Sequence, residues 1–173
     1  MAKVTLPPTF IVLDTETTGM RPEDGHSIVE LAAQKIAGRR VIGRFEMLVN
    51  PGHAMDPDAV KVHGISEIEL IANGRAPIEA FPAFAAFVGT TPLIAHNVGF
   101  DLAFLHAHHN RLNLPRLANQ AIDSIALARA VLILPSYSLA SVARFLKIPQ
   151  PHAHRAMADV ETLREVLFKL AER

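Results

Sequence analysis

The feature that most constrains the fold is a short apolar run that ends directly in acidic and hydroxyl residues. Residues 10–13 are continuously apolar, and Asp14, Thr15, Glu16 and Thr17 follow without a break. A continuous apolar run is typical of a strand buried on both faces at the centre of a sheet. If the strand continues, Asp14 and Glu16 lie on one side with Cα atoms about 6.6 Å apart and can share a metal ion. The alternative is a pair of ordinary surface acids.

The rest of the chain alternates between strand and helix patterns. Residues 28–36 and 41–49 predict a hairpin with a polar turn at 38–40, and residues 92–95 and 121–123 predict two short strands. Helical spacing covers residues 77–88, 100–112, 124–132, 138–146 and 156–171, with a broken helix over 57–70. These patterns predict an α/β fold with a mixed five-stranded sheet flanked by helices. The 173 residues are the size of one domain, which we expect to span 1–173.

Composition narrows the kinds of metal and partner. The chain has no cysteine, so disulfides and thiolate sites are excluded and a metal must bind oxygen or imidazole. Proteins that bind long stretches of duplex nucleic acid usually carry a basic surface that contacts many phosphates. The formal net charge here is zero, which fits a short contact with the end of a strand better. No apolar run approaches the roughly 20 residues that span a bilayer, and no secretory leader is evident. We therefore expect a soluble, cytoplasmic protein with no membrane partner.

Two further acids lie on the apolar faces of predicted helices. Asp101 shares its face with Phe104 and Leu105, and Asp159 shares one with Leu163. An ionised carboxylate on a buried face is costly unless it is paired or binds a metal. The alternative is that both acids only stabilise their helices, because a negative charge in the first turn interacts favourably with the helix dipole.

Four carboxylates at one point repel each other unless cations neutralise them. We infer that Asp14, Glu16, Asp101 and Asp159 hold two divalent cations, which in such sites lie about 3.5–4 Å apart and activate water for phosphodiester hydrolysis. Oxygen ligands favour Mg²⁺ or Mn²⁺.

A histidine near these acids is the natural base for the attacking water, since its ordinary pKa of about 6.5 is close to neutral. His154 stands five residues before Asp159, and helical positions five apart point about 140° away from each other. His154 must therefore act from the loop before the last helix. His152 is the alternative.

Taken together, these residues resemble the DEDDh family of 3′-to-5′ exonucleases, and within it the epsilon proofreading subunit of bacterial DNA polymerase III. The matching segments are residues 14–19, 28–31, 62–65 and 96–101, and His154 with Asp159. The resemblance implies a ribonuclease H-like fold and removal of nucleotides from a 3′ end as 5′-mononucleotides.

The resemblance also implies which residues meet the substrate. Thr15 and Thr17 would contact the terminal nucleotide through backbone or hydroxyl groups. Val62, His63 and Phe100 would line the pocket that takes the last base. Plain core packing is the alternative for Val62 and Phe100, and a satisfied structural histidine is the alternative for His63.

Three other features have interpretations that the sequence leaves to the structure. Glu30 interrupts the second apolar strand, where it either orients the loop after the first strand or faces an edge without a role. Asn97 is expected to cap the helix that follows it. The cluster of His106, His108 and His109 is expected to be a mostly solvated helix face rather than a metal site.

The resemblance to the epsilon subunit favours DNA, so we expect an exonuclease that acts on single-stranded 3′ ends of DNA. Two alternatives stay open. One is an RNA-trimming member of the same family, similar to oligoribonuclease or ribonuclease T, which tolerates the terminal 2′-hydroxyl. The other is a non-catalytic nuclease-like partner module.

The implied partners are a single-stranded 3′ end, the nucleoside monophosphate product and a DNA polymerase catalytic subunit. Epsilon subunits continue into a polymerase-joining segment whereas this sequence ends at Arg173, so a stand-alone enzyme and a shortened chain are both open.

Overall fold

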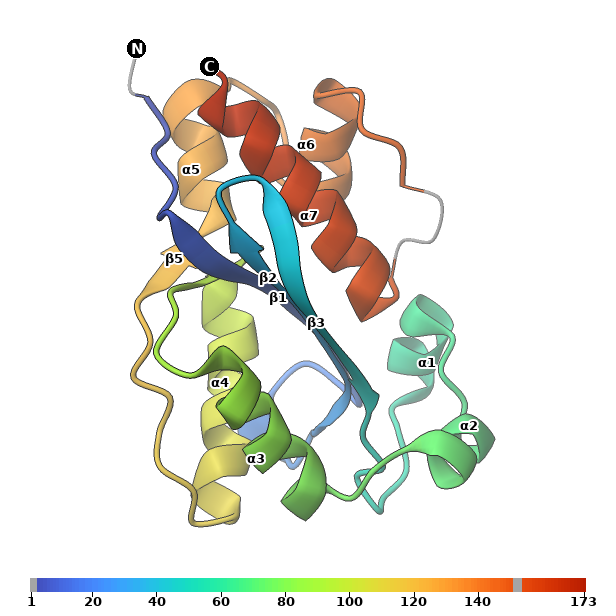
Figure 1. The fold of residues 1–173 in the computed structure, drawn as a ribbon. Coiled ribbons are helices and arrows are strands. Elements are labelled where there is room, and N and C mark those ends of the chain that lie inside the picture. Colours follow the sequence, from blue (N-terminus) through green and yellow to red (C-terminus); the bar gives the residue numbers. More distant parts are fainter. Residues whose placement is uncertain (1–2, 151–153) are drawn as a thin grey trace.

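The computed structural model describes residues 3–150 and 154–173 and contains a five-stranded sheet with helices on both faces (Figure 1). The strands are β1 (Thr9–Thr17), β2 (Ile28–Ala37), β3 (Arg40–Leu48), β4 (Leu93–Ala95) and β5 (Ala121–Asp123). The helices are α1 (Pro57–His63), α2 (Glu67–Asn73), α3 (Pro77–Val88), α4 (Val98–Arg111), α5 (Ser124–Val131), α6 (Leu139–Phe145) and α7 (Ala156–Ala171), with a short 3-10 turn, η1 (Pro22–Asp24).

β1 lies at the centre of the sheet, as its continuous apolar run predicted. The strand order is β3-β2-β1-β4-β5. β2 and β3 form an antiparallel hairpin beside β1, whereas β4 pairs with β1, and β5 with β4, in parallel. The predicted mixed sheet is confirmed. Because parallel strands end at the same edge of a sheet, the residues at the ends of β1, β4 and β5 come together there.

Alternate side chains of β1 enter two separate cores. Phe10 and Val12 belong to the core under α5, α6 and α7, whereas Ile11 and Leu13 belong to the core under α3 and α4, and all four are fully buried. Figure 1 shows α7 crossing one face of the sheet while α3 and α4 cover the other. The polar residues that continue β1 alternate between these same two faces.

The helices differ from the expected ones mainly at their starts. The segment predicted as a broken helix is two helices, because Gly64 ends α1 in a left-handed conformation with φ of 72° and Ser66 caps α2. α4 begins at Val98, two residues before the predicted start, and α7 has the predicted bounds. Among residues 3–150 and 154–173, none of the helices has the length and apolar character needed to cross a bilayer.

Candidate active site

The end of β1 and the start of α7 bring three of the predicted metal ligands together. β1 stays extended through Thr17, so its alternation places Asp14 and Glu16 on the α7 face of the sheet. Asp159 lies in the first turn of α7. Carboxylate oxygens of Asp14, Glu16 and Asp159 all lie within 4.8 Å of one another. A single cation can reach all three.

Asp101 approaches this group from the other face of the sheet. It lies in the first turn of α4 with 2% exposure, and its Oδ1 accepts a hydrogen bond from Thr15 Oγ1 at 2.8 Å. It is not among the acids that meet within 4.8 Å. Even so, after burial, its charge is the largest cause that raises the pKa of Asp14. The fourth carboxylate is thus held by the Thr15 hydroxyl on the other face of the sheet, and its charge acts on Asp14.

Burial and mutual repulsion make these carboxylates hard to ionise. Burial, then the charges of neighbouring acids, raises the pKa of Glu16 to about 8, and burial raises the pKa of Asp101 to about 7. Burial and the surrounding acids hold the pKa of Asp14 well above its ordinary range. Burial also raises the pKa of Asp159, against the lowering effect of a hydrogen bond from His154. Crowded carboxylates of this kind fit hard divalent cations such as Mg²⁺ or Mn²⁺.

His154 lies just before α7, as its spacing from Asp159 predicted. It is exposed, its backbone is left-handed with φ of 67°, and its N–H donates to Asp159 Oδ2 at 3.0 Å. A pocket of about 220 Å³ is lined by His154 together with Asp14, Asp159 and His96. The alternative base, His152, lies outside the described residues.

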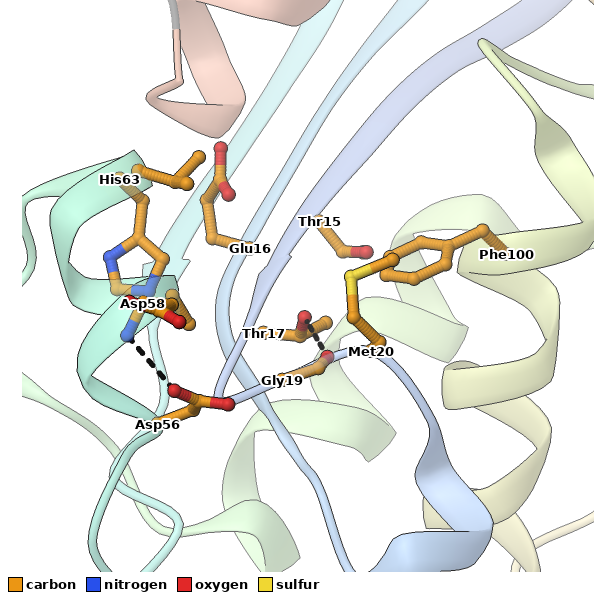
Figure 2. A pocket seen from close by; sticks show the side chains of 11 residues that line it. Thr15, Glu16, Thr17, Gly19, Met20, Asp56, Asp58, His63 and Phe100 are labelled. Atoms are coloured by element: carbon orange, nitrogen blue, oxygen red, sulfur yellow. Dashed lines mark hydrogen bonds between the residues drawn. The ribbon is translucent and has the colours of Figure 1, made fainter.

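A second pocket, of about 290 Å³, adjoins Glu16 (Figure 2). Its lining includes all five residues that the family resemblance assigned to the terminal nucleotide: Thr15, Thr17, Val62, His63 and Phe100. Figure 2 shows His63 and Phe100 on opposite sides of this pocket, with the two threonines between them. We call this cavity the nucleotide pocket, after the role that the family resemblance implies for it.

The side chains of the nucleotide pocket separate the interpretations that the sequence left open. Val62 is 55% exposed, so core packing does not explain it. Phe100 is half-buried, lining the pocket while its ring centroid lies 5.0 Å from that of Phe104. Only one of the two ring nitrogens of His63 makes a hydrogen bond. Its Nδ1 accepts the N–H of Ile65 at 3.0 Å, whereas its buried Nε2 has no hydrogen-bond partner among the described residues. Burial lowers the pKa of His63, which favours a neutral ring with its proton on Nε2.

Both threonine hydroxyl protons in the nucleotide pocket are used within the protein. Thr15 donates to Asp101, and Thr17 donates to the carbonyl oxygen of Gly19 at 2.7 Å (Figure 2). A substrate contact through these residues is left with the hydroxyl lone pairs or the backbone.

The sequence reasoning missed several residues of this pocket, among them Met20, Asp56 and Asp58. Met20 is 76% exposed and lies beside Phe100 in Figure 2. The sequence signal for Met20 was an apolar side chain in a polar loop, directly after residues 14–19. Asp56 accepts the N–H of Asp58 at 2.9 Å and so caps α1 at the pocket wall.

One of the two interpretations of Glu30 does not fit the structure. β2 lies between β1 and β3, so Glu30 is not at an edge, and it is 1% exposed. It accepts hydrogen bonds from Arg155 and from the N–H of Ala156 at the start of α7. The edge-facing interpretation is therefore wrong, and the hydrogen bonds of Glu30 go to the start of α7 rather than to the loop after β1.

Two local predictions at α4 differ from the structure. Asn97 does stand at the N-cap of α4, but it takes a left-handed conformation and makes no side-chain capping bond; its N–H instead donates to Asp123 Oδ1 at 3.1 Å. His108 and His109 are buried at 4% and 1% exposure rather than solvated. The His108 ring stacks on Phe81 of α3 at 4.1 Å, because this side of α4 packs under the sheet.

Comparisons with known proteins agree with this geometry. The family model described as Exonuclease matches residues 11–167. A DNA polymerase III subunit epsilon-like protein from Rhodobacter capsulatus is 36% identical over 167 residues, which cover 94% of this chain and 23% of that protein. A PolC-type DNA polymerase III from Oceanobacillus iheyensis is 33% identical over 166 residues, covering 95% of this chain and 12% of the polymerase. The chain thus spans about a quarter or less of these curated relatives.

Solved structures share the fold. E. coli exonuclease I in complex with a dT13 oligonucleotide matches with a TM-score of 0.84 and 23% identity, over 96% of this chain and 41% of that one. The zinc-ion-bound form of its complex with single-stranded DNA matches with a TM-score of 0.82 and 26% identity, over the same 96% and 41%. The predicted ribonuclease H-like fold is confirmed, and the chain belongs to the 3′-to-5′ exonuclease family that its sequence motifs resemble.

Proposed function

We propose that this chain forms one exonuclease domain that hydrolyses the last phosphodiester bond at the 3′ end of single-stranded DNA and releases 5′-mononucleotides. The observation that carries this proposal is the meeting of Asp14, Glu16 and Asp159 within 4.8 Å, with Glu16 also lining the nucleotide pocket. At about 290 Å³ the pocket is at the small end of ligand cavities, roughly 300–1,000 Å³, which suits a single terminal residue.

The four acids would hold two divalent cations, Mg²⁺ or Mn²⁺. Bound there, the cations would neutralise the carboxylates and stabilise the attacking and leaving oxygens. The carboxylate donors, and the raised pKa values that their crowding contributes to, support this assignment. A zinc-ion-bound form of E. coli exonuclease I supports a divalent-cation site in the fold.

Each side chain then has a defined task. His154 accepts a proton from the attacking water, whose oxygen bonds to the terminal phosphorus. The bond from phosphorus to the 3′ oxygen breaks and that oxygen takes a proton from solvent, so the strand keeps a 3′-hydroxyl and the released nucleotide keeps its 5′-phosphate. Val62, His63 and Phe100 hold the last base.

DNA is the substrate that the relatives favour. Two of them are named as DNA polymerase III proteins, and the structural neighbour is complexed with single-stranded DNA. We place the activity in proofreading or repair, with a DNA polymerase catalytic subunit as the partner. The zero net charge agrees with a contact limited to the strand end.

The test is a gel of a 5′-labelled single strand incubated with the protein and Mg²⁺ or Mn²⁺, with and without chelator. We expect a ladder that shortens from the 3′ end and disappears in chelator. Equal or faster shortening of the matched RNA strand would instead indicate an RNA-trimming enzyme. An intact strand between about pH 7 and 9 would indicate a non-catalytic partner module.

A further inference from the structure

A buried glutamate lies directly beside the proposed catalytic acids. Glu30 of β2 pairs in register with Glu16 of β1, and opposite residues of an antiparallel pair point to the same face of the sheet. That face is the one covered by α7, which supplies Asp159. At 1% exposure, the Glu30 carboxylate needs a compensating partner.

Both oxygens of Glu30 are used at the N-terminus of α7. Oε1 accepts from Arg155 Nη2 at 2.9 Å, and Oε2 accepts from the N–H of Ala156 at 2.9 Å. Arg155 Nε lies 3.3 Å from each oxygen. Arg155 is the N-cap residue of α7 but makes no side-chain capping bond, and first-turn N–H groups lack partners within a helix. Glu30 therefore caps α7 from a neighbouring strand, where the helix dipole favours a negative charge.

The Glu30–Arg155 pair, which we call the α7 clamp, is connected through the backbone to the two α7 residues of the site. His154 directly precedes Arg155, and its N–H donates to Asp159 Oδ2 at 3.0 Å. The Asp159 N–H in turn donates to the Arg155 carbonyl oxygen at 3.1 Å. A shift of Arg155 therefore moves both His154 and Asp159 relative to β1. A displacement of about 1 Å can cost a reaction about 100-fold in rate.

Net stability is a poor explanation for such a pair. Burial of the Glu30 carboxylate costs hydration that offsets much of the attraction, and solvent screens the Arg155 side chain, which is 42% exposed. The contact does, however, fix geometry, because Nη2 lies 2.9 Å from one carboxylate oxygen and Nε lies 3.3 Å from both, which restricts the angle as well as the distance. The same guanidinium lies 3.8 Å from Glu69 of α2, which ties the start of α7 to a second element.

We propose that the α7 clamp is a positioning device, which sets His154 and Asp159 against Asp14 and Glu16. This inference rests on the function proposed above for the site. Glu30 and Arg155 act through other residues and take no part in the bond changes.

The test compares Glu30→Gln and Arg155→Lys with a matched control, Glu161→Gln. Glu161 also joins α7 to the sheet, through an ion pair with Arg44 of β3 at 3.0 Å, but it is 45% exposed and outside both pockets of the site. Each protein is measured in three ways: single-turnover cleavage of a 5′-labelled strand at saturating Mg²⁺, KM for the strand, and Mn²⁺ binding without substrate by electron paramagnetic resonance.

We expect Glu30→Gln to slow cleavage about 10- to 100-fold and to weaken Mn²⁺ binding, with KM within about 3-fold of the original, as is typical when a partner of a metal ligand is lost. Arg155→Lys keeps the charge but not the planar fork, so its effects should be intermediate. Glu161→Gln should match the original protein in all three measurements.

Cleavage and Mn²⁺ binding equal to those of the control in both clamp variants would overturn the inference. If Glu30→Gln does not fold, as judged by circular dichroism, Arg155→Lys decides by the same readouts. If the original protein cleaves no strand, the proposed function fails, but Mn²⁺ binding still decides about the clamp: weaker binding than in the control supports it and equal binding overturns it.

Discussion

Asp14 is the residue with the most acidic surroundings in the site. Burial and the charges of Asp101, Glu16, Asp159 and Glu30 all raise its pKa. We expect Asp14→Asn to lose more than about 100-fold in activity, since changes next to a metal ligand alone cost 10–100-fold. Because one of several crowded charges is removed, the metal-free variant should melt at the same temperature as the original protein or higher. A large fall in melting temperature would contradict this.

His154, the proposed base, allows a second test at the scale of single residues, because its loss should affect the chemical step and not binding. It lines the pocket shared with Asp14 and Asp159, and its contact with Asp159 runs through the backbone N–H rather than the ring. His154→Ala should therefore keep metal and strand binding but slow the chemical step about 10²- to 10⁴-fold. Single-turnover rates with separately measured Mn²⁺ and strand affinities check this. Unchanged turnover would move the base role to His152 or to solvent.

A substitution at Thr15 tests whether its hydrogen bond positions Asp101. Its hydroxyl donates to Asp101 Oδ1 at 2.8 Å, and this bond lowers the pKa of Asp101 against the effect of burial. Thr15→Val has nearly the same shape but no donor, so the pKa of Asp101 should rise further and Mg²⁺ should bind about 10- to 100-fold more weakly. Thr15→Ser keeps the donor and serves as the control. Equal Mg²⁺ half-saturation in the Val and Ser variants would show that the bond is unimportant.

At the scale of elements, α4 carries a buried neutral histidine that joins it to β2 and α3. His108 Nε2 accepts the N–H of Ile28 at 3.0 Å while its ring stacks on Phe81. Burial, followed by nearby positive groups, lowers the pKa of His108 to about 4. Its ordinary value is 6.5. Protonation would remove the acceptor and place a charge between the two elements.

The sign of the pH effect follows from that depressed pKa. Between pH 6.5 and about 4 the unfolded chain binds the proton that the folded protein excludes, so stability falls as the pH falls. The slope from this one group is at most about 1.4 kcal/mol per pH unit. We expect urea unfolding in chelator to show a larger loss of stability on acidification for the original protein than for His108→Gln. Parallel curves would mean that His108 is not held neutral.

α7 is the element on which most of the site depends. Its first turn carries Asp159, its N-cap is Arg155, and His154 stands one residue before that cap. Val160 and Leu163 of the same helix pack into the core over β1. The helix thus connects the proposed catalytic residues to the packed core, so the position of its N-terminus should be sensitive to changes in the strands below.

At the scale of the whole molecule, the raised carboxylate pKa values predict how stability depends on pH and metal. Burial and neighbouring acids raise the pKa of Glu16 to about 8, and burial raises that of Asp101 to about 7. The folded protein therefore holds protons that the unfolded chain has released above about pH 4. This contribution to stability is complete at low pH and is lost as the pH rises through about 7 to 8.

Divalent cations should reverse that loss. We expect the melting temperature in chelator to fall between about pH 5 and 8.5, and saturating Mg²⁺ or Mn²⁺ to raise it most at the alkaline end. Metal at about 100 times its dissociation constant contributes about 2.7 kcal/mol. Asp14→Asn should show a smaller metal effect. A melting temperature in chelator that does not fall with pH, or that metal does not change, would contradict the crowded-carboxylate site.

The sequence by itself determined the local secondary structure and which side chains are available to the site. The apolar run before Asp14 predicted a central strand, and spacing predicted α7 with the right bounds and placed His154 before it. These features follow from the two-residue period of strands and the 3.6-residue period of helices, which short segments express on their own. The motif residues also predicted the family, because their order along the chain is visible without coordinates.

Only the tertiary structure decided how distant elements meet. Asp101 is hydrogen-bonded to Thr15, which is 86 residues away in the sequence, and Glu30 to Ala156 of α7, which is 126 residues away. His108 is buried where a solvated helix face was expected. Each of these depends on which faces of helix and strand pack together. Local periodicity shows that a face is apolar but not what covers it, since the same pattern suits many partners. The site itself is such a meeting, formed where β1 ends against the start of α7.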